Sequence, residues 1–195
     1  MAVLAILLAI GVLSVIGFVS PPFREQNLFR PYWFLPQRQY WTLVSSGFLH
    51  ADLAHLFFNA LTYWFFAPLL QRAIGGNRFV ALYFLGLVLS NLGTWIKHRR
   101  QPEYATLGAS GAITAVLFAA IVYFPRNSLI MLPIPVPIPA PLFAVLYLAF
   151  TYYAARRGGG RVNHDAHLDG ALTGLAFVAL TDPQAWVRAW QQVLG

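Results

Sequence analysis

The stretch Ala166-His167-Leu168-Asp169-Gly170-Ala171-Leu172-Thr173-Gly174 places a histidine and an acidic residue inside an apolar run. Gly170 and Gly174 form the pattern G-x-x-x-G, which lets two membrane helices approach closely. His167 precedes these glycines by three and seven residues, so all three share one helical stripe. We therefore expect a membrane helix over about 166–180 that presents His167 to a tightly packed neighbour. Taken alone, the histidine fits a structural hydrogen bond equally well.

The composition of the whole chain favours a membrane protein. Of 195 residues, 58% are hydrophobic and only 10% are charged, whereas soluble domains carry about 25% charged residues. The net charge of +7 comes from basic residues between apolar runs, where anionic lipid headgroups are nearer partners than nucleic acid. The chain has no cysteine, which excludes a disulfide, a thiol nucleophile and a cysteine-ligated metal. We expect no cofactor and no metal ion.

Six apolar stretches predict an all-α, polytopic membrane protein, a single domain over 1–195 with six transmembrane helices. A membrane helix uses about 20 residues, so this length leaves no room for a sizeable soluble domain. No basic residue precedes the first stretch, so we expect a span there and not a cleaved signal peptide. The predicted spans are about 2–19, 53–70, 79–96, 109–124, 142–155 and 166–180.

Two connecting segments have distinctive compositions. About thirty residues after the first span are rich in aromatic residues and prolines, and we expect this loop to lie in the membrane interface, where Trp and Tyr are favoured. Prolines occupy every second position from 133 to 141. Each proline lacks an N–H donor and disfavours helix in the residue before it, so the segment 132–141 is predicted to be an extended connector.

Polar side chains within apolar runs are costly, and they mark candidate sites. His55 and Asn59 are four residues apart near the start of the second span, so they stack on one helix face. Their shared face favours a site. His50, five residues before His55, is better explained as an anchor for the loop that precedes the span.

The segment Gly108-Ala109-Ser110-Gly111 follows a loop and opens the fourth span, with Thr114 one turn further on. A serine at a helix start has free backbone N–H groups beside its hydroxyl. By themselves, small residues of this kind are more often packing positions in a membrane helix than a site.

Membrane topology connects the three clusters. The second, fourth and sixth spans run parallel, so their beginnings lie on the same side of the membrane. His55, Ser110 and His167 each lie near such a beginning. A histidine that accepts the proton of a serine hydroxyl is the pair that nucleophilic acyl transfer requires. His55 and Asn59, together with the Ser110 N–H, are donors suited to stabilising an oxyanion.

These motifs resemble those of the rhomboid family of intramembrane serine proteases. The resemblance covers nearly the whole chain beyond the first span, and it is carried by HADLAHLFFN at 50–59, GASG at 108–111 and AHLDGALTG at 166–174. It implies a dyad of Ser110 and His167 without an acid, an oxyanion site of His55, Asn59 and the Ser110 amide, and a structural role for His50.

The resemblance also implies a multi-pass protein of a bacterial inner membrane. Its partners would be the lipid bilayer and single-span membrane proteins, which would enter a water-filled cavity laterally past the fifth span. Thr114 stands where the family often has an aromatic ring packed against the histidine, although threonine can still hydrogen-bond the imidazole. Asp165 and Asp169 lie two residues on either side of His167, where helix neighbours do not face each other, so no triad is expected.

The basic residues conflict with the usual orientation of the family. By the positive-inside rule, the side of Ser110 would be cytoplasmic, whereas bacterial relatives typically open outward. We therefore leave the orientation open. The loops after odd-numbered spans carry Arg24, Arg30, Arg38, Lys97, Arg99, Arg100, Arg156, Arg157 and Arg161, and the opposite side carries Arg72, Arg78, Arg126 and Arg188.

Two other functions fit parts of this pattern. A non-catalytic relative that binds membrane helices for quality control usually lacks the serine or the histidine, and both are present here. A small-solute transporter would have inverted repeats or broken helices in both halves, and the sequence has neither. The intramembrane protease is therefore the preferred hypothesis.

Overall fold

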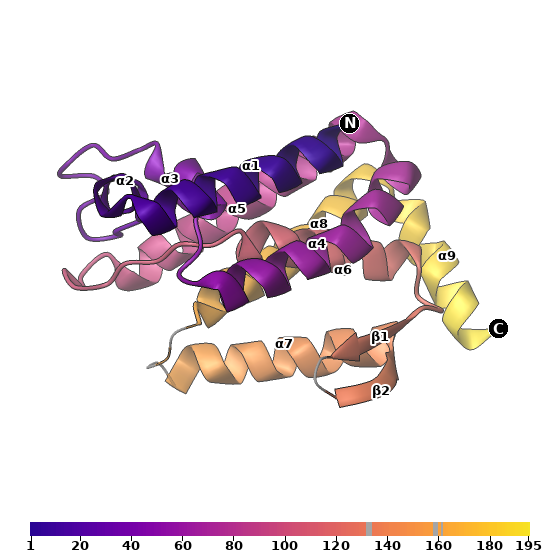
Figure 1. The fold of residues 1–195 in the computed structure, drawn as a ribbon. Coiled ribbons are helices and arrows are strands. Elements are labelled where there is room, and N and C mark those ends of the chain that lie inside the picture. Colours follow the sequence, from indigo (N-terminus) through magenta and orange to yellow (C-terminus); the bar gives the residue numbers. More distant parts are fainter. Residues whose placement is uncertain (132–133, 158–159, 161) are drawn as a thin grey trace.

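In the computed structural model, which describes residues 1–131, 134–157, 160 and 162–195, six long helices form one bundle (Figure 1). Each corresponds to one of the predicted apolar stretches, and α6 is one residue shorter at each end than its stretch 109–124. The all-α membrane fold class is confirmed. By length and composition, α1, α4 and α5 can cross a membrane, whereas the strongly apolar α6 has only 14 residues. The six helices are α1 Ala2–Val19, α4 Leu53–Ile74, α5 Gly76–His98, α6 Ser110–Tyr123, α7 Ala140–Arg157 and α8 His164–Thr181.

The predicted interfacial loop after α1 is partly helical. It contains α2 Pro21–Asn27, α3 Thr42–Ser45 and a 3₁₀ turn, η1 Ser46–Phe48. Phe29 is fully buried and packs edge-on against another phenylalanine of the loop, with ring centroids 5.5 Å apart. The backbone of Phe29 also pairs with Thr106 in the loop before α6. The aromatic residues therefore fix this loop against the end of the bundle from which α6 starts.

The proline-rich connector forms the second strand of an antiparallel hairpin, β1 Ser128–Met131 with β2 Ile134–Pro139. Residues 132–133 of the predicted connector lie outside the described residues. Its last two residues, 140 and 141, instead begin α7, because a proline in the first turn of a helix sacrifices no intrahelical hydrogen bond.

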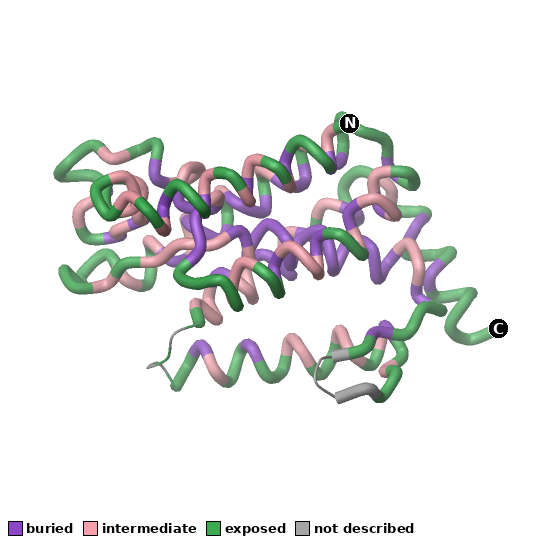
Figure 2. Tube along the Cα trace, in the orientation of Figure 1, coloured by how far each residue is buried: buried purple, intermediate pink, exposed green. Residues whose placement is uncertain are grey.

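Helix α6 is the centre of the bundle. Every residue from 111 to 122 is buried, and Figure 2 shows this segment as a purple trace between the other helices. It contacts α4, α5, α7, α8 and the C-terminal helix. A helix that is apolar on all sides belongs in an interior. Because Ser110 is the first residue of α6, its hydroxyl lies at one end of the most buried helix of the protein.

Helices α6 and α8 touch at their backbones. A Cβ atom added to Gly170 would lie 2.2 Å from the carbonyl oxygen of Gly111, and one added to Gly174 would lie 2.2 Å from that of Ala115. Contacts of this length to backbone atoms are not tolerated, so only glycine fits at both positions of α8. This close approach holds the start of α8, with His167, against the start of α6, with Ser110.

The Gly170→Ala variant is therefore expected to lose stability, because the new methyl group meets backbone atoms that no rotamer change can remove. Overpacking of this kind costs about 1–3 kcal/mol, which corresponds to a fall in Tm of roughly 2–12 °C for a chain of this size. The fall in Tm is measured by thermal unfolding in detergent. The matched control is Gly11→Ala in α1, where an added Cβ meets nothing within 4 Å. Equal melting temperatures for the two variants would contradict the packing argument.

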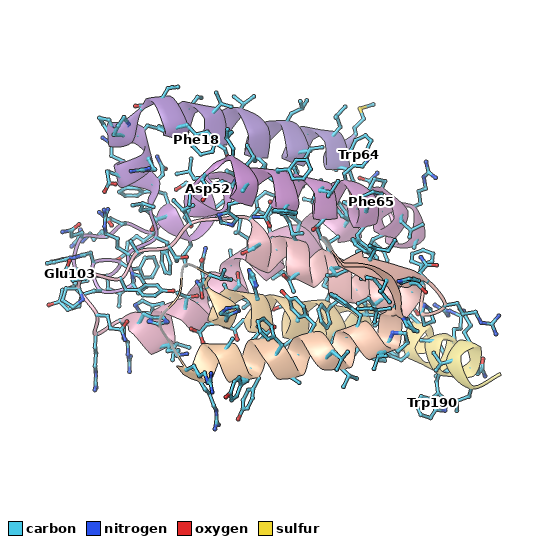
Figure 3. All side chains as sticks on the ribbon, turned by 60° about the horizontal axis from the view of Figure 1, so that its bottom comes forward. Phe18, Asp52, Trp64, Phe65, Glu103 and Trp190 are labelled. Atoms are coloured by element: carbon cyan, nitrogen blue, oxygen red, sulfur yellow. The ribbon has the colours of Figure 1, made fainter. Side chains whose placement is uncertain are left out.

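The chain continues beyond the last predicted span into a further helix, α9 Pro183–Leu194. Its buried face consists of Ala185 and Ala189, one turn apart, which pack on the bundle. Trp186 and Trp190 are exposed on a neighbouring face, and Figure 3 shows Trp190 pointing away from the bundle. No helix was predicted here, because the apolar residues of this segment form a stripe and not a continuous run.

Candidate active site

A cavity of about 700 Å³ lies between α4, α6, α7, α8 and the strand β1. Its lining is mainly apolar and includes Phe65 of α4, which Figure 3 labels. The lining includes Ser110, the first residue of α6, and residues 127–130, which follow the end of that helix. On α6 itself the lining runs from Ser110 to Leu117, the first half of that helix. The polar and aromatic residues at its Ser110 end are Asn59, Ser110, Thr114, Tyr147 and His167.

Ser110 is placed by the turn that precedes α6. Gly108 has a φ of +125°, a left-handed conformation that favours glycine, and its N–H donates to the Ser46 carbonyl at 3.0 Å. The first intrahelical bond recorded at this helix start runs from Ile113 N–H to the Ala109 carbonyl, so the N–H groups before it are available at the Ser110 end. Within the described residues, Ser110 Oγ and His167 line one cavity but make no direct hydrogen bond.

His55 lies against the Ser110 turn. A Cβ atom on Gly108 would be 2.8 Å from His55 Cε1, 3.1 Å from His55 Nε2 and 3.9 Å from Ser110 Oγ. The imidazole and the hydroxyl therefore both face the space that Gly108 leaves open. The position of His55 is set by the start of α4, where its backbone N–H donates to the capping carboxylate of Asp52 at 2.8 Å.

Asn59 lies one turn after His55 and lines the cavity. Its side chain is only 8% exposed, and its Nδ2 has no hydrogen-bond partner among the described residues. A buried amide donor without a partner costs free energy. Asn59 therefore offers an unused N–H donor in the cavity that Ser110 also lines, which is the property that an oxyanion site needs.

His50 is buried outside the cavity lining and joins two other parts of the protein. Its Nδ1 lies 2.8 Å from Ser14 Oγ of α1, and that hydroxyl donates to the Phe48 carbonyl at 3.0 Å. Its ring packs edge-on against His55, with centroids 4.8 Å apart. His50 thus packs against the ring of His55 and anchors the loop before α4 to α1.

The imidazole of His167 contacts α7. Its Nδ1 lies 3.1 Å from the hydroxyl oxygen of Tyr147, and the two rings are nearly parallel, with centroids 6.4 Å apart. The ring of His164 lies edge-on at 6.0 Å. The hydroxyl of Thr114, a possible hydrogen-bond partner of His167 from its position in the sequence, donates instead to the Ser110 carbonyl at 2.7 Å.

The two aspartates near His167 point toward α5. Asp165 accepts from Lys97 at 2.6 Å and lies 3.0 Å from His98 Nε2. Asp169 packs against Gly93, where an added Cβ would lie 1.8 Å from its Oδ2. Among the described residues neither carboxylate contacts His167, and both are directed to α5 instead.

A charged cluster around Asp165 joins the start of α8 to the end of α5. His98 stacks on Tyr104 in the loop before α6, with centroids 3.8 Å apart. Burial, followed by the nearby negative charge of Asp165, raises the pKa of Tyr104 to about 12, so its phenol stays neutral at physiological pH. Asn163 caps α8 and also donates to Thr94 of α5 at 3.0 Å. These contacts tie the start of α8 to α5.

Sequence reasoning missed Tyr147. It was absent from the set of polar residues in apolar runs because tyrosine is common in membrane helices. A signal was present nonetheless: Tyr147 and Thr151 are four residues apart, so two hydroxyl groups lie on one face of the fifth apolar stretch.

The fold and the cavity together define an integral, multi-pass membrane protein whose central helix presents a serine beside a histidine of a neighbouring helix. A family model described as "Rhomboid domain" matches residues 37–183. The chain belongs to the rhomboid family.

Several named relatives are similar to this chain. It is 37% identical over 95 residues to the putative rhomboid protease YdcA of Bacillus subtilis (strain 168). The aligned residues make up 47% of this chain and 46% of the relative. It is 25% identical over 152 residues to the rhomboid protease GluP of the same organism, covering 77% and 28%. The presenilin-associated rhomboid-like protein, mitochondrial, of Homo sapiens is 28% identical over 159 residues, covering 77% and 42%. The chain spans less than half the length of these curated relatives.

Proposed function

We propose that this protein is an intramembrane serine protease that cleaves the transmembrane segments of single-span membrane proteins. The observation that carries the proposal is one cavity lined by Ser110, by His167 and by the unpartnered amide of Asn59. A nucleophile, a base and an oxyanion donor are the three parts that acyl transfer to water requires. Membership of the family, and relatives named as rhomboid proteases, support the same chemistry.

In this mechanism Ser110 Oγ attacks the scissile carbonyl while His167 accepts its proton. The imidazolium then returns that proton to the leaving amine, and a water molecule hydrolyses the acyl-enzyme with His167 again as base. The negative charge on the carbonyl oxygen is stabilised by donors from His55, Asn59 and the Ser110 amide. A substrate helix reaches the hydroxyl through the cavity, by passing between α4 and α7. The apolar lining of this cavity, called the groove below, suits a lipid-soluble segment.

The groove favours membrane substrates over soluble ones. Its lining on α4 runs from Phe58 to Leu69, about 17 Å at about 1.5 Å per residue, so it can hold about three turns of a substrate helix. We propose that the protein lies in a bacterial inner membrane and that its partners are the lipid bilayer and single-span membrane proteins. No nucleic-acid partner is proposed, because the polar groups of the cavity are enclosed by apolar side chains.

The purified protein, reconstituted in vesicles, is expected to cleave one or more of a panel of single-span reporters at a bond inside or beside the apolar segment. Mass spectrometry of the two products locates the cut. A soluble peptide with the same residues around the cut, but no apolar segment, is expected to react far more slowly. Binding of reporters without any cleavage would instead favour a non-catalytic helix-binding function and would overturn the proposal.

A further inference from the structure

We propose that the end of the bundle with Ser110 and His167 faces the cytoplasm, where it binds anionic lipid headgroups. The inference rests on the proposed location in a bacterial inner membrane, and it goes beyond the proposed function, whose chemistry is the same in either orientation. The residues that bind the headgroups form a basic surface at the ends of α5 and α7, which consists of Arg99, Arg100, Arg156 and Arg157.

The ends of α5 and α7 are joined by Lys97, in the last turn of α5. Its ammonium group donates to the carbonyl of Ala155 in the last turn of α7 and to the carboxylate of Asp165 at the start of α8. The last carbonyl groups of a helix have no intrahelical partner, so a lysine is favourable there. Two segments far apart in the sequence therefore end side by side, on the left of Figure 1, where α8 begins.

The charges of the basic surface are available to a partner outside the protein. Arg99 and Arg100 follow the last residue of α5, and Arg156 and Arg157 are the last residues of α7. All four are exposed, and none pairs with an acidic side chain among the described residues. The charge of Lys97, in contrast, is used within the bundle.

Aromatic rings hold three of these guanidinium groups at the helix ends. Each ring lies four residues before its arginine, and a cation over an aromatic face is attracted to it. Trp and Tyr are favoured at the level of the lipid headgroups, so each stacked pair sets its positive charge at that level. The distances to the ring centroids are 5.5 Å for Arg99 over Trp95, 4.6 Å for Arg156 over Tyr152 and 4.4 Å for Arg157 over Tyr153.

The opposite end of the bundle has no comparable surface among the described residues. Arg188 pairs with Asp182 at 2.7 Å, and Arg126 donates to the Gln192 carbonyl at 2.9 Å. These two arginines therefore contribute to the attachment of α9. Within the described part of the chain, no aromatic ring lies under a guanidinium group at this end.

The basic side chains thus distinguish the two ends of the bundle. Lys and Arg accumulate in short loops on the cytoplasmic side, where anionic lipids attract them. Nine of the thirteen Lys and Arg residues belong to the Ser110 end. Without the long loop after α1, the arginines that make no ion pair or hydrogen bond to a described residue are the four of the basic surface, and Arg72 and Arg78 at the other end. The difference therefore does not depend on where that loop lies.

This orientation sets where a substrate of the proposed protease would be cut. Ser110 is the first residue of α6 and His167 lies in the first turn of α8, so the reacting atoms are near the cytoplasmic ends of these spans. A single-span substrate would be cleaved toward the cytoplasmic end of its apolar segment, and its cytoplasmic part would be released into the cytoplasm. Bacterial relatives typically open in the other direction.

The orientation can be measured with single cysteines, because the chain has none of its own. Gly160→Cys marks the Ser110 end and Gly76→Cys the opposite end, and an added Cβ meets nothing within 4 Å at either position. In sealed spheroplasts treated with a membrane-impermeant maleimide, we expect labelling of Gly76→Cys alone. Gly160→Cys should be labelled only after detergent opens the membrane. Any other pattern would overturn the inference.

The role of the basic surface is tested by replacing its four arginines with glutamine in the Gly160→Cys protein. We expect a mixed orientation, seen as new labelling of Gly160→Cys in sealed spheroplasts. The matched control replaces Arg72 and Arg78 with glutamine and should leave Gly160→Cys protected. Full protection in the fourfold variant would overturn the role of the basic surface, and the single-cysteine pattern of the unaltered surface tests the orientation even if that variant fails to fold.

Failure of this inference and failure of the proposed function give different results, because labelling needs no catalysis. The expected labelling pattern in a protein that cleaves no reporter would refute the proposed function alone. Cleavage of reporters by a protein whose Gly160→Cys variant is labelled in sealed spheroplasts would refute the orientation alone.

Discussion

Replacing Ser110 by alanine is expected to abolish reporter cleavage, with a loss of at least about 10⁴-fold in kcat. The hydroxyl is the only proposed atom that forms a bond to the substrate, so no neighbouring group can substitute for it. The fold should be unaffected, because Ser110 Oγ makes no hydrogen bond to any described residue and alanine only removes that oxygen. Cleavage rates in vesicles and melting temperatures in detergent measure the two effects separately.

Covalent labelling gives a second reading of the same variant. A fluorophosphonate should modify the unaltered protein at Ser110 and should not modify Ser110→Ala. The matched control is Ser128→Ala, because Ser128 lines the far end of the same cavity and has no role in the mechanism. Labelling that persists in Ser110→Ala, or that is lost in Ser128→Ala, would place the nucleophile elsewhere.

The His167→Ala variant is expected to lower kcat by about 10⁴-fold, as removal of the base does in serine hydrolases. Without the imidazole, the Ser110 hydroxyl keeps its proton and the leaving amine receives none. Substrate binding uses the apolar groove, so KM should change little. Steady-state cleavage of a reporter at several concentrations separates kcat from KM, and fluorophosphonate labelling should slow in parallel.

His164→Ala is the appropriate control for this second variant. His164 is on the same helix, one turn earlier, and its ring lies 6.0 Å from that of His167, but it does not line the cavity within the described residues. We expect it to retain most of its activity, since its ring packs on His167 and on Phe150 of α7 but does not face the cavity. Equal losses in the two histidine variants would mean that the imidazole of His167 acts through packing and not as the base.

The helices could be predicted because their signals are local. The apolar runs appear in the structure as α1, α4, α5, α6, α7 and α8, and their cores agree with the predicted spans. The ends differ by a few residues where a local rule prevails. Helix α4 continues to Ile74, beyond the predicted end at residue 70. Within this segment the first residue with a positive φ is Gly75, at +82°, and such a residue ends the helix.

The amphipathic helix α9 was not predicted, for the opposite reason. A search for continuous apolar runs finds buried or membrane-crossing segments, but α9 buries only two alanines and exposes its tryptophans. Its place is set by packing on the bundle. The loop after α1 was predicted to lie in the membrane interface; what the sequence could not show is that Phe29 pairs with Thr106 in the loop before α6.

The candidate residues on α4, α6 and α8 could be named from the sequence, because polar groups in apolar runs are few and parallel spans begin on one side. Which of them touch could not be named. Rotation of each helix about its axis decides whether a side chain enters a cavity, and that rotation is set by contacts between residues far apart in the chain. One example is the pair Asp165 and Asp169, which are two residues from His167 in the sequence but contact α5 in the structure.

The amino-acid sequence by itself determined the class of protein, the order of its helices and the identity of a serine and a histidine with the chemistry of acyl transfer. These depend on composition and on spacing along one helix, which are local properties. Only the tertiary structure decided that Tyr147 of α7 contacts His167 and that Asn59 has a free donor in the same cavity. Both facts depend on how separate helices pack side by side, because a hydrogen bond between helices needs an approach within about 3 Å that no pattern in one segment encodes.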